Sequence, residues 1–124
     1  MVIWQYIVVA LLITFAGIAK AIQDTIQFHF STSVFAKLGD YWNPQTSWKR
    51  KYKNCDPKQG ETFLGSTTIF VSLTDAWHLF GLIREFSLIG ALSIATLNPW
   101  LVLGYVLFVS VFHIFFTWIL DKKK

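Results

Sequence analysis

Three long apolar stretches and one polar stretch alternate along the chain. Residues 2–21 form the first apolar stretch, and its uncharged core has about the 20 residues that a helix needs to cross a bilayer. Residues 66–96 form a second, interrupted stretch, and residues 99–120 form a third in which only His113 ionises near neutral pH. The pattern predicts an all-α integral membrane protein with three transmembrane helices, folded as a single membrane domain over residues 1–124.

The first apolar stretch has two interpretations at its ends. Trp4 and Tyr6 lie near its outer end, where aromatic belts meet the membrane surface. Residues 19–21 (Ala-Lys-Ala) resemble a signal-peptide cleavage site, but no basic residue precedes the apolar run. We therefore expect a retained helix. Beyond it, helical and strand-like spacings overlap, and we favour a helix to about Phe30 followed by an interfacial segment.

A polar loop over residues about 31–62 separates the first two apolar stretches. Turn signals occur at Asn43-Pro44 and Asp56-Pro57, and basic residues are concentrated in its second half. Basic loops stay on the cytoplasmic side of a membrane, and three lysines at residues 122–124 follow the last apolar stretch. The chain is therefore expected to have its N-terminus outside, with the loop and the C-terminus inside.

Composition supports a membrane protein over a soluble domain. Hydrophobic residues make up 54% of the 124 residues and charged residues 15%, whereas soluble domains carry about 25% charged residues. The net charge of +4 comes from basic residues beside apolar segments, so it is not by itself a nucleic-acid signal. Cys55 is the single cysteine, which excludes an internal disulfide.

Four ionisable residues interrupt the second apolar stretch, within SLTDAWHLFGLIREF at residues 72–86. If this segment is helical, Asp75, His78 and Glu85 share one face at 100° per residue. Arg84 points the opposite way. Neighbours in sequence do not face each other on a helix, so Arg84 and Glu85 are not expected to pair. Arg84 should then have a separate partner or extend to a membrane surface.

The third apolar stretch carries its own narrow polar strip. Ser110, Thr117 and Asp121 lie within one side of a helix around His113. His113 is about 11 Å from the cytoplasmic end of that helix by helical rise. If the middle helix enters the membrane near residues 67–70, His78 lies at a similar depth. The two histidines are therefore predicted to meet in the cytoplasmic half of the bilayer.

Three interpretations of this polar face remain open. In the first, the polar groups only join helices by hydrogen bonds, and no cofactor is needed. In the second, Asp75, His78 and His113 bind a divalent transition metal such as zinc, and Glu85 acts as catalytic acid/base. No HExxH or paired CxxC accompanies them. In the third, the ionisable groups form a proton or small-substrate pathway.

A basic and aromatic cluster marks the loop as a docking surface. Such clusters bind anionic lipid headgroups, at about 1 kcal/mol per cation, or a partner protein. Binding of single-stranded nucleic acid is the weaker alternative beside a membrane. The cluster comprises Trp48, Lys49, Arg50, Lys51, Tyr52 and Lys53.

Two runs, WNPQTSWKRKYKNCDPKQG and GSTTIFVSLTDAWHLF, resemble an uncharacterised family of small bacterial integral membrane proteins. The resemblance covers residues about 20–85 and includes the DTIQF motif before the loop. It implies a multi-pass protein of the bacterial inner (cytoplasmic) membrane, with the loop and the middle apolar stretch forming one functional unit. It implies no activity and no site roles.

These patterns favour a non-enzymatic subunit or assembly module of a membrane complex. Three helices bury little surface, so a homo-oligomer or a larger complex is expected. The first alternative is a metal-dependent membrane enzyme that acts at the cytoplasmic leaflet. The second is a component of a proton or small-substrate pathway.

Overall fold

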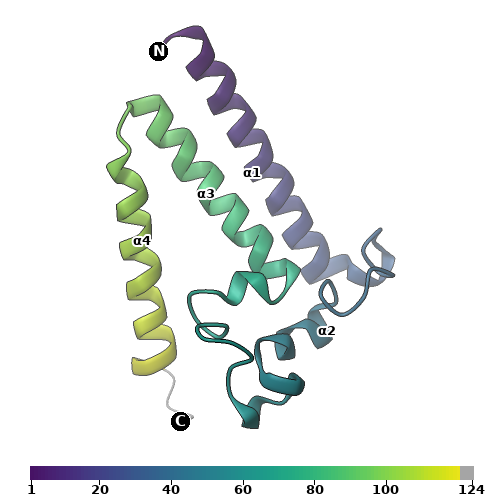
Figure 1. Ribbon diagram of the computed structural model, residues 1–124. Coiled ribbons are helices and arrows are strands. Elements are labelled where there is room, and N and C mark those ends of the chain that lie inside the picture. Colours follow the sequence, from purple (N-terminus) through teal and green to yellow (C-terminus); the bar gives the residue numbers. More distant parts are fainter. Residues whose placement is uncertain (121–124) are drawn as a thin grey trace.

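The computed structural model describes residues 1–120, without the side chain of Thr117, and this part of the chain is helical with no strand (Figure 1). The predicted all-α class is confirmed. The tail with Asp121 and the three lysines, on which the predicted orientation partly depends, lies outside the described residues. The α-helices are α1 (Ile3–His29), α2 (Pro44–Ser47), α3 (Ala76–Thr96) and α4 (Trp100–His113).

Helices α1 and α3 lie side by side and antiparallel (Figure 1). Near one end, the Gln5 side-chain amide donates to the carbonyl of Ile94 at 3.1 Å. Near the other, the Gln23 amide donates to the carbonyl of Trp77 at 3.2 Å. Both glutamine side chains are buried, although both belong to an apolar helix. The pair is therefore joined by polar contacts at both ends.

Small residues line the contact between these two helices. Ala16 and Ala19 of α1 and Ala91 of α3 are buried, as is Ser87. Without a hydrophobic driving force between helices in lipid, small side chains let two backbones approach closely enough for van der Waals packing. A β-carbon on Gly81 would lie 2.8 Å from the Gln23 amide nitrogen, which makes Gly81 the closest glycine contact of the pair.

The middle helix is shorter than predicted. Residues 66–96 were expected to be one span, but α3 begins at Ala76 and a 3₁₀ turn occupies Val71–Leu73. Gly65, just before this stretch, has a φ of 82° in a turn, and the Asp75 side chain caps α3. The 21 residues of α3 still extend about 31 Å, close to a hydrocarbon core of roughly 30 Å.

The N-terminal helix and the loop follow the sequence signals closely. Helix α1 ends at His29, which confirms the predicted helix to about Phe30. Asn43 caps α2 by accepting a hydrogen bond from the Gln45 amide, and Asp56 caps the turn Pro57–Gln59 by accepting one from the Lys58 amide. Each of these caps precedes a proline, so the two predicted turn signals became helix starts. Short 3₁₀ turns cover Trp48–Lys51, Lys53–Cys55 and Pro57–Gln59.

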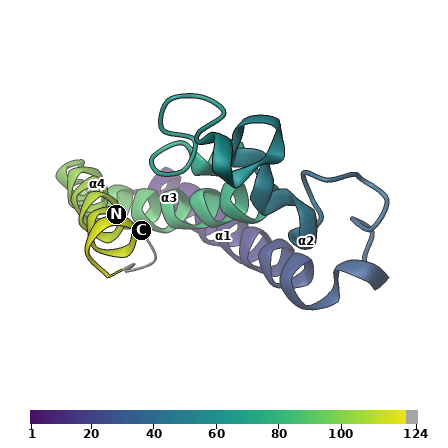
Figure 2. The ribbon, with the colours of Figure 1, turned by 90° about the horizontal axis from the view of Figure 1, so that it is seen from below.

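Helix α4 returns along the other side of α3, which lies between α1 and α4 in both views (Figures 1 and 2). Its aromatic contact with α3 is an edge-on pair of Phe86 and Tyr105. No described side chain of α4 is buried. A π-helical turn over Ile114–Ile119 extends it.

Two described helices, Ile3–Thr32 and Ala76–Thr96, are long and apolar enough to cross a bilayer. The apolar helix Trp100–Phe116 is shorter. The third predicted span therefore stays a prediction. Viewed from below, the loop lies on one side of the layer formed by the three long helices (Figure 2).

Candidate functional site

Asp75 is the N-cap of α3. One carboxylate oxygen accepts the backbone amide of His78 at 2.8 Å, and the other lies 2.7 Å from the Nδ1 atom of the same residue. Its backbone is extended (φ −154°, ψ 158°), so Asp75 does not continue the helical face that the sequence predicted. Aspartate is favoured here because it accepts an otherwise unpaired amide and because a negative charge is stabilised at a helix N-terminus.

His78 is oriented by this contact. A carboxylate on Nδ1 favours the tautomer with the proton on that nitrogen, which leaves Nε2 as the free ring nitrogen. The ring packs edge-on against Trp77, with centroids 5.1 Å apart. Asp75 is buried, whereas the side chain of His78 is 36% exposed. The pair is therefore open to a ligand only through the histidine.

Arg50 connects the basic loop to the start of α3. Its Nε donates to the Thr74 carbonyl at 3.2 Å, and its guanidinium lies over the Tyr41 ring at 5.6 Å. The Tyr41 carbonyl in turn accepts the Ala76 amide. Burial raises the pKa of the Tyr41 hydroxyl, the Asp75 charge adds to that, and the Arg50 charge opposes it. Loop and helix thus form one folded unit at this end.

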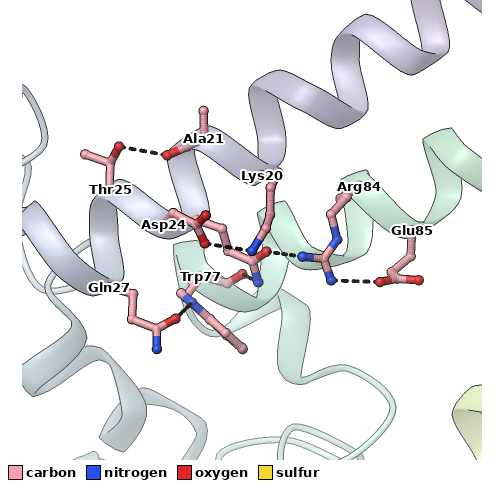
Figure 3. Close-up of polar contacts among 9 residues, drawn as sticks. Lys20, Ala21, Asp24, Thr25, Gln27, Trp77, Arg84 and Glu85 are labelled. Atoms are coloured by element: carbon pink, nitrogen blue, oxygen red, sulfur yellow. Dashed lines mark hydrogen bonds and ion pairs between the residues drawn. The ribbon is translucent and has the colours of Figure 1, made fainter.

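A second polar cluster lies on α1 and α3 (Figure 3). The Arg84 Nη1 donates to the Gln23 side-chain oxygen at 2.9 Å, and Nη2 donates to Glu85 at 2.7 Å. The prediction that Arg84 and Glu85 do not pair is wrong. Their backbones diverge, but the long guanidinium fork has several donors and reaches two acceptors at once. The expected separate partner of Arg84 is Gln23.

Weaker contacts extend this cluster along α1. Lys20 and Asp24 form an exposed ion pair at 2.8 Å, and the Trp77 indole donates to Gln27 at 3.3 Å (Figure 3). Exposed pairs of this kind contribute about 0 to 1 kcal/mol. The buried Gln23, which contacts both Trp77 and Arg84, is the central residue of the cluster.

Gln5 and Gln23 were missed by the sequence interpretation. They are polar residues in an otherwise apolar helix, and their spacing of 18 residues is five helical turns, which places both on one face. That spacing was the available signal.

Glu85 is seven residues from His78 and so lies two turns further along α3, bonded to Arg84 rather than to Asp75 or His78.

His113 lies in a groove of about 580 Å³ between α3 and α4. The residues that line this groove do not include His78. Within residues 1–120, no three His, Cys, Asp or Glu side chains gather closely enough to hold a metal ion. The structure therefore brings Asp75 and His78 together, while the predicted metal set of Asp75, His78 and His113 stays a prediction.

The basic and aromatic loop pairs its cations with its own rings. Lys49 lies over Trp48 at 5.3 Å, and Lys51 lies over Tyr52 at 5.5 Å. Lys49, Arg50 and Lys53 are exposed, and Arg50 also donates to the Thr74 carbonyl. Exposed cations beside amphipathic rings suit contact with lipid headgroups.

Glu61 organises the segment that follows the loop. Its carboxylate accepts hydrogen bonds from the Gly65 amide and from the amide and hydroxyl of Thr67. The Thr67 hydroxyl and the Gly65 amide are the main reasons why the pKa of Glu61 lies below its usual range. Its neighbour across an isolated antiparallel bridge is Tyr52.

Comparison of the chain with protein-family models, with curated proteins and with solved structures found no match. The resemblance drawn from the loop and the middle stretch therefore stays a prediction.

Proposed function

We propose that this chain is a small integral membrane protein that acts as a non-enzymatic subunit or assembly module of a membrane complex. One contrast carries the proposal. Helices α1 and α3 are joined through buried glutamines, whereas α4 presents apolar side chains with none of its described residues buried. A helix with so little intramolecular packing gains stability from lipid or from further helices.

The polar clusters support a structural role. Within residues 1–120, no buried side-chain nitrogen or oxygen lacks a hydrogen-bond partner. Gln23 and Asp75 are both buried, and both are bonded to other protein groups. Bonded polar groups of this kind contribute about 0.6 to 2 kcal/mol each to helix association in a membrane. They hold the chain's own fold together and leave α4 available for a partner.

The outer side of α4 is the surface proposed for a partner helix. A shallow apolar hollow there includes Gly104. A β-carbon added to this glycine would have no other side chain within 4 Å. Close approach at a glycine and stacked aromatic rings are features of helix contacts in membranes. The hollow is lined by Gly104, Leu107, Phe108, Val111, Phe112, Phe115, Phe116 and Leu120.

Photo-crosslinking in native membranes tests this proposal. A benzophenone amino acid at Leu107 should give one discrete protein adduct, whereas the same probe at Val109, in the groove, should give lipid adducts. Gly104→Leu should abolish the Leu107 adduct because it fills the point of close approach. Only lipid adducts at Leu107, or an adduct that persists in Gly104→Leu, would refute a partner on this face.

A metal-dependent enzyme is a second candidate, favoured by the Asp75–His78 contact. A carboxylate on one ring nitrogen commonly orients a metal-binding histidine, and here it leaves Nε2 of His78 free. Asp75 would then orient His78, Glu85 would be the acid/base group, and further ligands would come from His113, water or another chain. Elemental analysis of the purified protein tests this candidate. A stoichiometric transition metal that is lost in His78→Ala would support the metal-dependent enzyme, and absence of the metal from the unaltered protein would refute it.

A further inference from the structure

We propose that the groove between α3 and α4 binds one acyl chain of an anionic phospholipid, whose phosphate lies beside the basic loop. The inference rests on the proposed membrane location, and it assigns a ligand to the groove rather than to the outer face of α4. The groove volume of about 580 Å³ falls within the range of about 300–1,000 Å³ typical of ligand pockets.

The groove has three walls. Leu82 and Phe86 of α3 form one wall, and α4 forms the opposite wall from Tyr105 onward. The third side is closed by residues between the loop and α3, namely Thr68, Ile69, Phe70, Ser72 and Leu73. Its lining is mainly apolar, and the Ser110 hydroxyl already donates to the Val106 carbonyl at 2.8 Å. Such a lining suits hydrocarbon better than a polar substrate.

The length of the groove matches one leaflet. Its lining on the C-terminal helix extends from Tyr105 to Trp118, which is about 20 Å by helical rise. Half of a hydrocarbon core is roughly 15 Å. The groove is therefore long enough to hold an acyl chain that enters from the loop side and extends through the whole leaflet.

The basic loop is joined to the segment that lines the groove. The backbone carbonyl of Lys51 accepts the Ser66 hydroxyl at 2.7 Å and the Thr62 amide at 3.0 Å, and Ser66 comes two residues before Thr68, the first residue of the lining. Five basic residues and two acidic residues occur over residues 48–62. One of the two acids, Glu61, is engaged by Gly65 and Thr67. The excess of cations favours an anionic headgroup over a zwitterionic one.

Native mass spectrometry of the full-length protein tests the proposal. Detergent-purified, delipidated protein is mixed with phosphatidylglycerol or with phosphatidylcholine of the same acyl chains, and retained lipid is counted. We expect one retained phosphatidylglycerol per chain and at least tenfold less phosphatidylcholine. Equal retention would refute the anionic headgroup, and no retention of either lipid would refute the site.

Two valines of α4 supply a matched pair of variants. Val106 lines the groove and Val111 lines the outer hollow, and their exposed fractions are 50% and 44%. Val106→Trp should reduce retained phosphatidylglycerol at least tenfold, whereas Val111→Trp should leave it unchanged. Ser110→Phe fills the groove independently and should act like Val106→Trp. Circular dichroism confirms folding of each variant, and equal retention in all three would overturn the proposal.

The headgroup contact has its own control. Lys49→Gln with Lys51→Gln should remove the preference for phosphatidylglycerol, whereas Lys37→Gln, outside the basic cluster, should preserve it. An unchanged preference in the double variant would exclude the loop as the headgroup site. Because crosslinking at Leu107 reports only on the outer face of α4, a failed lipid experiment is distinguishable from a failed partner experiment.

Discussion

Asp75 has two separable roles at the scale of single residues, since one oxygen caps α3 and the other contacts His78. Asp75→Ala should destabilise the protein by about 1 kcal/mol through loss of the cap. Asp75→Asn keeps an acceptor for the His78 amide and should recover most of that loss. Unfolding followed by circular dichroism in micelles measures both. Equal destabilisation by the two variants would contradict the assigned capping role.

Glu61 should make the segment around Gly65 sensitive to acid. Its folded-state pKa lies below the unfolded value of 4.5, so its stabilising effect is complete above about pH 4.5. The effect is lost as the pH falls through the folded-state pKa. Amide hydrogen exchange at Gly65 and Thr67 should therefore accelerate below pH 4.5, beyond the intrinsic pH dependence. Glu61→Gln should show faster exchange at neutral pH and no such acid transition.

At the scale of elements, the α1–α3 contact depends on the missing side chain of Gly81. The added methyl of Gly81→Ala would lie 2.8 Å from the amide nitrogen of Gln23. The Gln23 side chain is held in place because its nitrogen donates to the Trp77 carbonyl and its oxygen accepts from Arg84. Overpacking of this kind costs about 1–3 kcal/mol. The free energy of unfolding in mixed micelles should fall accordingly.

Gly17→Ala is the matched control, because no other side chain lies within 4 Å of that glycine. It should be neutral or should stabilise α1 by up to about 1 kcal/mol through helix propensity. In a Gln23→Ala background, the cost of Gly81→Ala should largely disappear. A cost that persisted there would show that the clash is with the backbone rather than with Gln23.

The elements were predictable where local chemistry decides them. The length of the apolar run was sufficient to predict α1, and the prolines after Asn43 and Asp56 were sufficient to predict the loop turns. The start of α3 was not predictable, because residues 66–75 are as apolar as a span but form turns, and the helix begins only after the capping carboxylate of Asp75. The Gln23–Arg84 contact joins residues 61 positions apart, and a single sequence gives no such pairing.

At the scale of the whole molecule, the single cysteine reports the topology. Cys55 is exposed in the basic loop, which is predicted to be cytoplasmic. A membrane-impermeant maleimide should label inside-out vesicles and leave intact cells unlabelled. In a Cys55→Ser background, Asn98→Cys should show the reverse pattern if α3 crosses, as the three-span arrangement requires. Labelling of both positions from one side would refute the three-span arrangement.

The two glutamine contacts fix how α1 and α3 are aligned along their axes. Gln5 and Gln23 are 18 residues apart, about 27 Å along the helix. Sliding one helix by a turn, about 5.4 Å, would separate both amides from their carbonyl partners, at several kcal/mol for each unpaired group in hydrocarbon. Spin-label distances across the pair should therefore stay constant between thin and thick bilayers, while the tilt changes. The two helices would then tilt together as one rigid body. A change in membrane thickness would change this tilt and would rotate α4 with it.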